Sequence, residues 1–287
     1  MLERSYLFVP GIKKRMIEKA LLSESDIVII DLEDAVAEDE KENARNILQD
    51  VLNNDLNKKK VIVRINALNT PYWQQDLQEV LTSKASGIVL PKAENAEDIE
   101  SVCKFIECYE GKDEFEVIPL IESAKGVYYA LEIAQAHSYV KRLAFGSVDY
   151  SLDVGATLTS TGLELLYARS AIVVASKVAG IESPIDSVFM DIQNLTGFEA
   201  EIIRAKELGF KAKLLIHPSQ IASVNSLFSP SKVEIVNALG IVRVFEESLE
   251  QGIAAVSYEG SLIDYPVYKK SKELIEFYNR NGVGIHD

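Results

Sequence analysis

The chain has 287 residues, 30 basic and 44 acidic, so its formal net charge is −14. No run of basic residues is longer than three, which argues against a nucleic-acid-binding surface, because cations must gather there to displace counterions. The first residues lack the pattern of a signal peptide, and no uncharged stretch reaches the roughly 20 residues of a membrane span. We therefore expect a soluble, cytoplasmic protein that binds neither nucleic acid nor a membrane.

Short runs rich in β-branched residues recur along the chain, and each is followed by a longer segment with helical periodicity. The short runs predict strands over 6–9, 27–32, 61–65, 87–90, 117–121, 143–148, 185–189 and 213–216. The periodic segments predict helices that include 13–22, 97–109, 124–136, 163–179 and 197–208. This alternation is typical of parallel strands joined by helices.

Eight strand-helix units predict a (β/α)₈ TIM barrel over residues 1–225, because eight parallel strands can close into a cylinder. An open, doubly wound sheet is the alternative. Residues 226–287 predict a C-terminal helical extension, with helices over 231–251 and 267–279 and a turn at Glu259-Gly260. No linker rich in Pro, Gly or Ser separates the extension from the barrel, so we interpret it as an appendage of one domain.

Polar residues follow several predicted strands, at the ends where barrel enzymes place their working groups. They are Asp31, Glu33, Asp34, Arg64, Asn66, Glu122, Asp149 and His217. Some have simpler explanations, since Asp34 and Asp149 are equally suited to cap a following helix. A lone histidine such as His217 is more often a structural hydrogen-bonding partner than a catalytic base.

Glu122 and Asp149 end adjacent predicted strands, which lie about 4.8 Å apart in a sheet. Two carboxylates that close need a proton or a cation between them. Oxygen ligands from only two side chains, with room for water and substrate oxygens, suit Mg²⁺ better than a closed zinc site. The spacing therefore predicts a divalent-metal site at Glu122 and Asp149.

The candidate cations each have two interpretations. Arg64 lies in the apolar strand VIVRIN, where an unpaired guanidinium would be costly. Its partner is either a carboxylate of Glu33 or Asp34 or a substrate carboxylate, and both can apply together. Arg15 and Lys19, one helical turn apart, form either a solvated helix face or a pair of cations for phosphates. Lys92 is a weak candidate for a Schiff base.

Nine strings, spread over nearly the whole chain, together resemble the citrate lyase beta-subunit-like branch of the HpcH/HpaI aldolase superfamily. They are SYLFVPG, DLEDAV, VRIN, LPK, IPLIES, FGSVDY, LLYARS, IHPSQI and SLIDYP. The resemblance implies a TIM barrel that uses Mg²⁺, or Mn²⁺ in its place, to break or form a carbon-carbon bond. The implied substrate is a 3-hydroxyacyl-CoA such as citramalyl-CoA, malyl-CoA or citryl-CoA, and the products are acetyl-CoA and a 2-oxo acid.

The resemblance also implies residue roles. Glu122 and Asp149 match the metal ligands, with Glu122 also at the substrate, and Arg64 matches the residue that holds substrate and stabilises the enolate oxygen. Asp264, a turn residue by spacing alone, matches a catalytic carboxylate that the tail of a neighbouring subunit delivers in relatives. The positions that match contacts to the CoA substrate are Phe8, Arg15 and Lys19.

The assembly is left open by the resemblance. The chain is either a free-standing lyase, the beta subunit of a citrate lyase complex with alpha and carrier subunits and a carrier-bound citryl thioester, or a metal-dependent aldolase of free 2-oxo acids. Relatives form small homo-oligomers, and a trimer is favoured. Val148 and Glu259 depart from residues that many relatives carry, which leaves the choice of substrate undecided.

Overall fold

The computed structural model describes residues 3–53 and 59–281. The chain divides into two compact units, one over Glu3–Asn225 and the other from Ser226 onward. The predicted ranges 1–225 and 226–287 also include residues 1–2, 54–58 and 282–287, which lie outside the described part. The predicted packing of the extension on a neighbouring subunit stays a prediction. No helix in the described ranges is both long enough and apolar enough to span a membrane.

The first unit is a closed barrel in which every neighbouring pair of strands is parallel, including β8 with β1. Its strands are β1 (Ser5–Pro10), β2 (Ile27–Asp31), β3 (Lys60–Arg64), β4 (Gly87–Leu90), β5 (Glu116–Ile121), β6 (Ala144–Phe145), β7 (Ile185–Asp186) and β8 (Ala212–Leu215). The predicted (β/α)₈ barrel is confirmed, and the open sheet is wrong.

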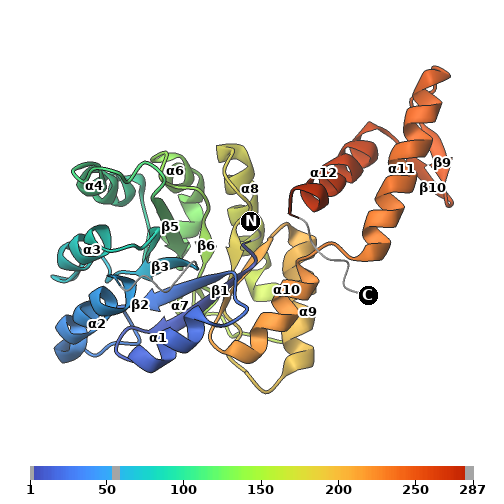
Figure 1. Ribbon diagram of the computed structural model, residues 1–287. Coiled ribbons are helices and arrows are strands. Elements are labelled where there is room, and N and C mark those ends of the chain that lie inside the picture. Colours follow the sequence, from blue (N-terminus) through green and yellow to red (C-terminus); the bar gives the residue numbers. More distant parts are fainter. Residues whose placement is uncertain (1–2, 54–58, 282–287) are drawn as a thin grey trace. The chain divides into compact units, whose positions relative to one another are not determined.

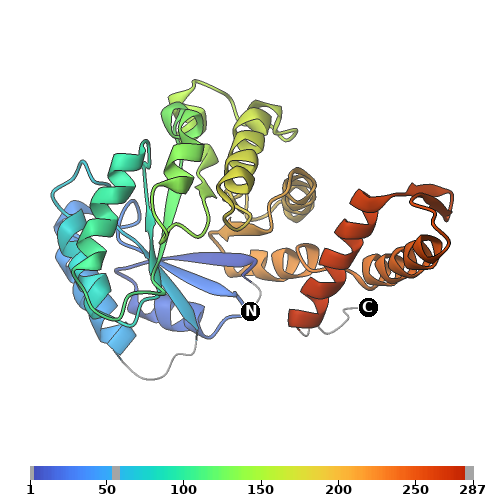
Figure 2. The same ribbon diagram turned by 90° about the horizontal axis from the view of Figure 1, so that it is seen from above.

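The helices of this unit lie outside the strands (Figures 1 and 2). They are α1 (Lys14–Leu21), η1 (Glu38–Glu40), α2 (Lys41–Asn53), α3 (Trp73–Thr82), α4 (Ala96–Glu107), α5 (Ala124–Tyr128), α6 (Ala130–Gln135), α7 (Ser147–Asp153), η2 (Leu163–Leu165), α8 (Leu166–Ala179), α9 (Leu195–Leu208), η3 (Pro218–Gln220) and α10 (Ile221–Leu227). The helix predicted over 124–136 is therefore two short helices.

Alternate residues of the strands fill the barrel interior, as the period of two in a β-strand requires. The interior cluster contains Tyr6, Ile27, Ile29, Ile62, Val89, Ile118, Leu120, Ala144, Ile185, Ala212 and Leu214. On β1, β2, β3, β5 and β7 the residue two positions after the last member of this cluster also lies on the inner face of the barrel. These residues are Phe8, Asp31, Arg64, Glu122 and Ser187. The barrel interior is thus apolar along most of its length and largely polar at the C-terminal ends of the strands.

Two predicted strands are shorter than expected. The strand predicted over 143–148 pairs only at Ala144–Phe145, and the strand predicted over 185–189 pairs only at Ile185–Asp186. The ladder stops after β6 because the Ser147 N–H donates to a side chain, Ser187 Oγ, at 2.8 Å. Helix α7 begins there, so Asp149 lies in its first turn and not at a strand end as predicted.

The second unit consists of α11 (Lys232–Glu250), β9 (Val256–Tyr258), β10 (Ser261–Ile263) and α12 (Tyr265–Asn281). Helices α11 and α12 lie side by side, with the two strands at one end (Figure 1). Both residues of the predicted Glu259-Gly260 turn have positive φ, and they join the antiparallel pair of strands, which the sequence did not predict. Ile241, Phe245 and Ile263 form the buried core of this unit.

Candidate active site

Arg64, the last residue of β3, is held by carboxylates at the end of β2. Asp31 is its neighbour in the strand register, and the Nε and Nη2 atoms of Arg64 each donate to one Asp31 oxygen at 2.7 Å. The Nη1 atom lies 3.2 Å from Glu33 and 3.3 Å from Asp34. The predicted pairing with Glu33 or Asp34 is thus present, but Asp31 makes the paired contact because alternation puts Asp31 and Arg64 on the same inner face.

Phe8, on β1, completes the surroundings of the guanidinium. The Cζ atom of Arg64 lies 5.0 Å from the centroid of the Phe8 ring, within the range of a cation–π interaction. Although burial opposes it, the Asp31 carboxylate raises the pKa of Arg64 above its ordinary value, with help from Glu33 and Asp34. Arg64 is therefore charged and fixed in orientation.

The loop after β2 is held in place by hydrogen bonds to buried groups. Asp31 accepts hydrogen bonds from the N–H groups of Glu33 at 2.9 Å and Ala35 at 3.1 Å. The buried Lys41 ammonium donates to the carbonyl oxygens of Leu32 at 2.7 Å and Glu33 at 2.8 Å. These bonds hold the backbone that carries Glu33, and the sequence alone did not identify Lys41 in this role.

Glu122 follows β5 and is only 5% exposed. Its Oε1 atom accepts a hydrogen bond from the Lys92 N–H at 2.8 Å. The pKa of Glu122 is raised to about 8, chiefly by burial and also by the charges of Glu33 and Asp149, whereas the Lys92 N–H and Arg64 act in the opposite direction. The structure therefore gathers Glu122, Asp149 and Arg64 in one charged cluster, although Asp149 comes from a helix and is itself exposed.

The absence of a side chain at Gly146 leaves room for the Glu122 carboxylate. A Cβ atom on Gly146 would lie 2.7 Å from both Cβ and Oε2 of Glu122, closer than non-bonded atoms approach. Glycine is therefore needed at the junction of β6 and α7 if the carboxylate is to keep its place.

Lys92 and Glu33 also belong to this charged cluster. Lys92 has a φ of 52°, a strained conformation for a residue with a side chain, and its Nζ atom lies 3.4 Å from Glu33. Burial raises the pKa of Glu33 to about 7, although the positive charges of Arg64 and Lys92 lower it. Although burial opposes it, Glu33 raises the pKa of Lys92, the opposite of what a Schiff-base lysine needs.

The charges of this cluster fit a divalent cation. Five carboxylates share it with three cations, an excess of two negative charges before any proton is bound; they are Asp31, Glu33, Asp34, Glu122 and Asp149 against Lys41, Arg64 and Lys92. Among the described residues no group of three or more His, Cys, Asp or Glu side chains is arranged to hold a metal ion. Two carboxylate ligands, with water or substrate oxygens at the other positions, suit Mg²⁺.

The other predicted site residues are Arg15, Lys19, His217 and Asp264. Arg15 and Lys19 are exposed on α1, and neither is paired with a carboxylate of the described residues. His217 is exposed and accepts a hydrogen bond from the Ser219 N–H at 3.2 Å, as the structural interpretation requires. Asp264 belongs to the second unit, follows β10, and accepts a hydrogen bond from the Val267 N–H at 3.2 Å.

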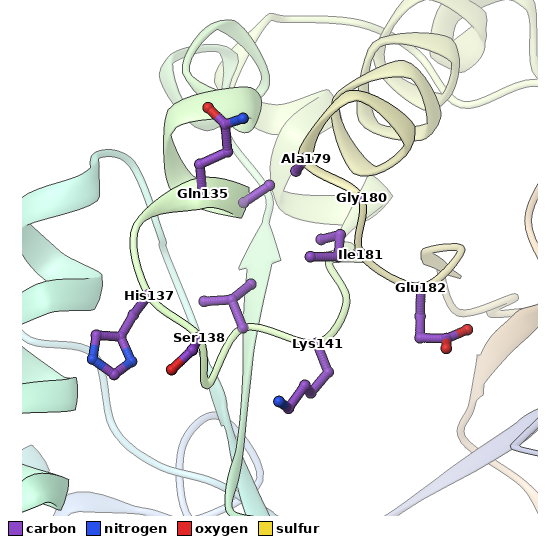
Figure 3. Close-up of a pocket in the computed structure, with 10 residues that line it drawn as sticks. Gln135, His137, Ser138, Lys141, Ala179, Gly180, Ile181 and Glu182 are labelled. Atoms are coloured by element: carbon purple, nitrogen blue, oxygen red, sulfur yellow. The ribbon is translucent and has the colours of Figure 1, made fainter.

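A hollow of about 580 Å³ lies on the first unit, lined by residues of the connections that precede β6 and β7. Figure 3 shows His137 and Glu182 on opposite sides of it. Residues that precede strands lie at the N-terminal end of a barrel, away from the face that carries catalytic groups. None of the predicted site residues lines this hollow, so it is not the candidate active site.

A closed parallel barrel that gathers carboxylates and an arginine at the C-terminal ends of its strands defines the class of metal-dependent barrel enzymes. A family model described as HpcH/HpaI aldolase/citrate lyase matches residues 4–218. The chain belongs to this family, and the prediction made from the nine sequence strings is confirmed.

Two relatives match nearly the whole chain. The citrate lyase subunit beta of Leuconostoc mesenteroides subsp. cremoris is 34% identical over 286 residues, 98% of this chain and 94% of the relative. The L-malyl-CoA/beta-methylmalyl-CoA lyase of Rhodobacter capsulatus is 32% identical over 299 aligned positions, 96% of this chain and 94% of the relative. Both are lyases, in agreement with the predicted class of carbon-carbon lyase.

The fold is also shared with the protein CitE from Mycobacterium tuberculosis, solved in complex with magnesium, acetoacetate and coenzyme A. The match has a TM-score of 0.80 and 30% identity, and covers 96% of this chain and 97% of that one. A relative with this fold thus holds magnesium, the metal predicted for this chain.

Proposed function

We propose that this protein is a Mg²⁺-dependent carbon-carbon lyase that cleaves, or forms, a 3-hydroxyacyl-CoA thioester such as citramalyl-CoA, malyl-CoA or citryl-CoA. The observation that carries the proposal is the buried Glu122 carboxylate, which shares a cluster of excess negative charge with Asp149 beside Arg64. The magnesium and coenzyme A bound by a relative with the same fold support it. Mn²⁺ is expected to replace Mg²⁺, because both are hard cations that oxygen ligands bind.

In this proposal Glu122 and Asp149 would hold the metal ion, which would supply a Lewis acid to the substrate. Arg64, which its carboxylate partners fix in orientation, donates to the thioester oxygen as negative charge develops on it. The hydroxyl proton passes to solvent as the carbon-carbon bond breaks, and the electron pair of that bond forms the enolate of acetyl-CoA. A carboxyl group then protonates the enolate carbon.

We assign this last step to Asp264, delivered from the extension of a neighbouring subunit in a homo-oligomer, with a trimer favoured. Its place in a unit separate from the barrel supports delivery to another copy. An Asp264→Asn variant should lose mainly turnover. Mixing it with an Arg64→Ala variant, under conditions where subunits exchange, should restore part of the activity. If exchange is demonstrated and no activity returns, the site is not shared between subunits.

Arg15, Lys19 and Phe8 are assigned to the CoA moiety. The two cations are exposed on α1 and have no carboxylate partner among the described residues, so they are available to phosphate groups. Changing both to methionine should raise KM for the CoA thioester about tenfold or more, because each charge-assisted contact contributes about 1 kcal/mol or more. The kcat value should change little.

The substrate is tested directly by incubating the purified protein and Mg²⁺ with malyl-CoA, citramalyl-CoA and citryl-CoA, and trapping glyoxylate, pyruvate or oxaloacetate. At least one 2-oxo acid should form and should require the metal ion. If none forms, and acetyl-CoA does not condense with any of the three 2-oxo acids, the proposed lyase activity is wrong. Cleavage of a free 4-hydroxy-2-oxo acid without CoA would instead indicate an aldolase of free 2-oxo acids.

A second candidate function is the beta subunit of a citrate lyase complex, which acts on a carrier-bound citryl thioester with alpha and carrier subunits. The similarity to a citrate lyase subunit beta over 98% of the chain favours it. Activity that appears only when carrier and alpha subunits are added would support this function over the free-standing lyase. In both cases we propose a cytoplasmic location, on the grounds of composition.

A further inference from the structure

The junction between β6 and α7, which carries the chain toward Asp149, is anchored on both sides. The Gly146 N–H donates to the Ile121 carbonyl oxygen of β5 at 2.9 Å. On the other side the Ser147 N–H donates to Ser187 Oγ at 2.8 Å. Asp149 follows two residues later, in the first turn of α7, so its position depends on these two bonds.

The second hydrogen bond is accepted by the side chain of Ser187 and not by a backbone carbonyl group, because the neighbouring strand, β7, has already ended. Ser187 follows β7, whose last residue is Asp186, and alternation places Ser187 on the inner face, above Ile185 of the interior cluster. Ser187 is fully buried, and Ser147 is 4% exposed. A buried N–H that loses its acceptor costs about 1–3 kcal/mol, so the junction has a strong preference for this arrangement.

The two hydroxyl groups also touch, with their Oγ atoms 2.7 Å apart. The two serines therefore have unequal roles. Removing the Ser187 hydroxyl takes the acceptor from the Ser147 N–H, whereas removing the Ser147 hydroxyl leaves that bond intact. Helix α7 has only seven residues, too few for its own hydrogen bonds to define its direction.

We propose that Ser187 is a positioning residue of the metal site: its hydroxyl holds the start of α7 so that Asp149 faces Glu122. The proposal rests on the proposed assignment of Glu122 and Asp149 as ligands. Groups that orient metal ligands typically contribute 10–100-fold to metal affinity. Because Ser187 acts through the backbone, we expect a value near the lower end of that range.

The test measures Mg²⁺ binding to the full-length protein by calorimetry, independently of turnover. Ser187→Ala should bind Mg²⁺ about tenfold more weakly than the unchanged protein. Ser147→Ala is the matched variant, since it removes an adjacent hydroxyl but keeps the anchoring bond, and it should lose less than about threefold. Ser176→Ala, which removes a buried hydroxyl that donates to the Ile172 carbonyl oxygen on α8, should bind Mg²⁺ as the unchanged protein does.

Hydrogen exchange gives a second readout that needs no metal. The amides of α7 should exchange faster in Ser187→Ala than in Ser147→Ala or Ser176→Ala. If Ser187→Ala does not fold, Ser187→Cys, which keeps most of the volume and has only a weak acceptor, should show both effects. Unchanged Mg²⁺ affinity in a folded Ser187 variant, or equal losses in Ser147→Ala and Ser187→Ala, would overturn the proposal. Mg²⁺ binding that Glu122→Gln leaves unchanged would overturn the ligand assignment itself.

Discussion

Two charged clusters lie on the same barrel, and they differ in how their charges are balanced. The outer cluster joins Asp186 of β7 to its register neighbour Lys213 of β8, and adds Arg169 and Glu201 from helices. Asp186 accepts from Lys213 at 2.6 Å and from Arg169 at 2.8 Å, and Lys213 also donates to Glu201 at 2.7 Å. Two cations meet two carboxylates in this cluster.

The cluster at the C-terminal ends of the strands has no such balance. Although burial opposes it, Lys213 and Arg169 hold the pKa of Asp186 below its ordinary value, whereas burial raises the pKa of Glu33 to about 7 and that of Glu122 to about 8. A buried cluster whose charges match is satisfied by its own ion pairs and needs no further ion. A cluster with excess carboxylates takes up protons or a cation, and this distinguishes the candidate active site from a structural ion-pair network.

The largest expected effect is a loss of activity when a carboxylate of the cluster at the strand ends is changed. Glu122→Gln should lower the Mg²⁺-dependent rate about 10³-fold or more, because it removes a charged metal ligand worth several kcal/mol in the transition state. Asp149→Asn should behave alike. Both variants should melt near the temperature of the unchanged protein without metal, since each change keeps the size and shape of the side chain. Normal activity in either variant would contradict the metal assignment.

In the outer cluster we expect a loss of stability and no loss of Mg²⁺ binding. Asp186→Asn should lower the free energy of unfolding by about 3–5 kcal/mol, because it leaves Arg169 and Lys213 buried with one carboxylate between them. The measurement is denaturant unfolding. The folded fraction should bind Mg²⁺ with unchanged affinity, and a marked loss of affinity would show that the clusters are not independent.

A smaller effect is expected from crowding the site without changing its charge. Gly146→Ala places a methyl group 2.7 Å from Glu122 Oε2, so the carboxylate must move. We expect a roughly 10–100-fold loss of Mg²⁺ affinity, measured by calorimetry. Gly180→Ala, at a positive-φ helix end with open space around it, is the control for the general cost of replacing a glycine and should leave Mg²⁺ affinity unchanged.

The most gradual expected effect is a dependence on pH. The pKa of Glu122 is raised from 4.5 to about 8 in the folded protein, so without metal Glu122 favours the folded state most at low pH. This advantage is lost as the pH rises from about 4.5 to about 8. The unfolding free energy of the metal-free protein, relative to Glu122→Gln, should therefore fall over this window.

Mg²⁺ affinity should rise over the same window, by at most about tenfold per pH unit, because the ion replaces the Glu122 proton. Calorimetry at pH 6, 7 and 8 measures this dependence. If neither the relative unfolding free energy nor the affinity changes with pH, the carboxylate is ionised throughout and the contrast between the two clusters is weaker than the structure indicates.

Local periodicity was enough to predict the barrel. Continuous short apolar runs define the strands and a period of 3.6 between them defines the helices, without reference to distant residues, and eight such units close. The same reasoning placed Arg64 and Glu122 at strand ends on the correct face of the barrel. It did not predict the hairpin of β9 and β10, since strands of three residues carry too little pattern.

The sequence by itself determined the architecture, the strand ends that carry Arg64 and Glu122, and the family. Only the tertiary structure decided that Asp31 pairs with Arg64, that Asp149 lies on a helix, and that Gly146 and Ser187 shape its surroundings. Strand register and the end of a ladder depend on hydrogen bonds between residues far apart in the chain. Those bonds leave no local periodicity, so a single sequence does not reveal them.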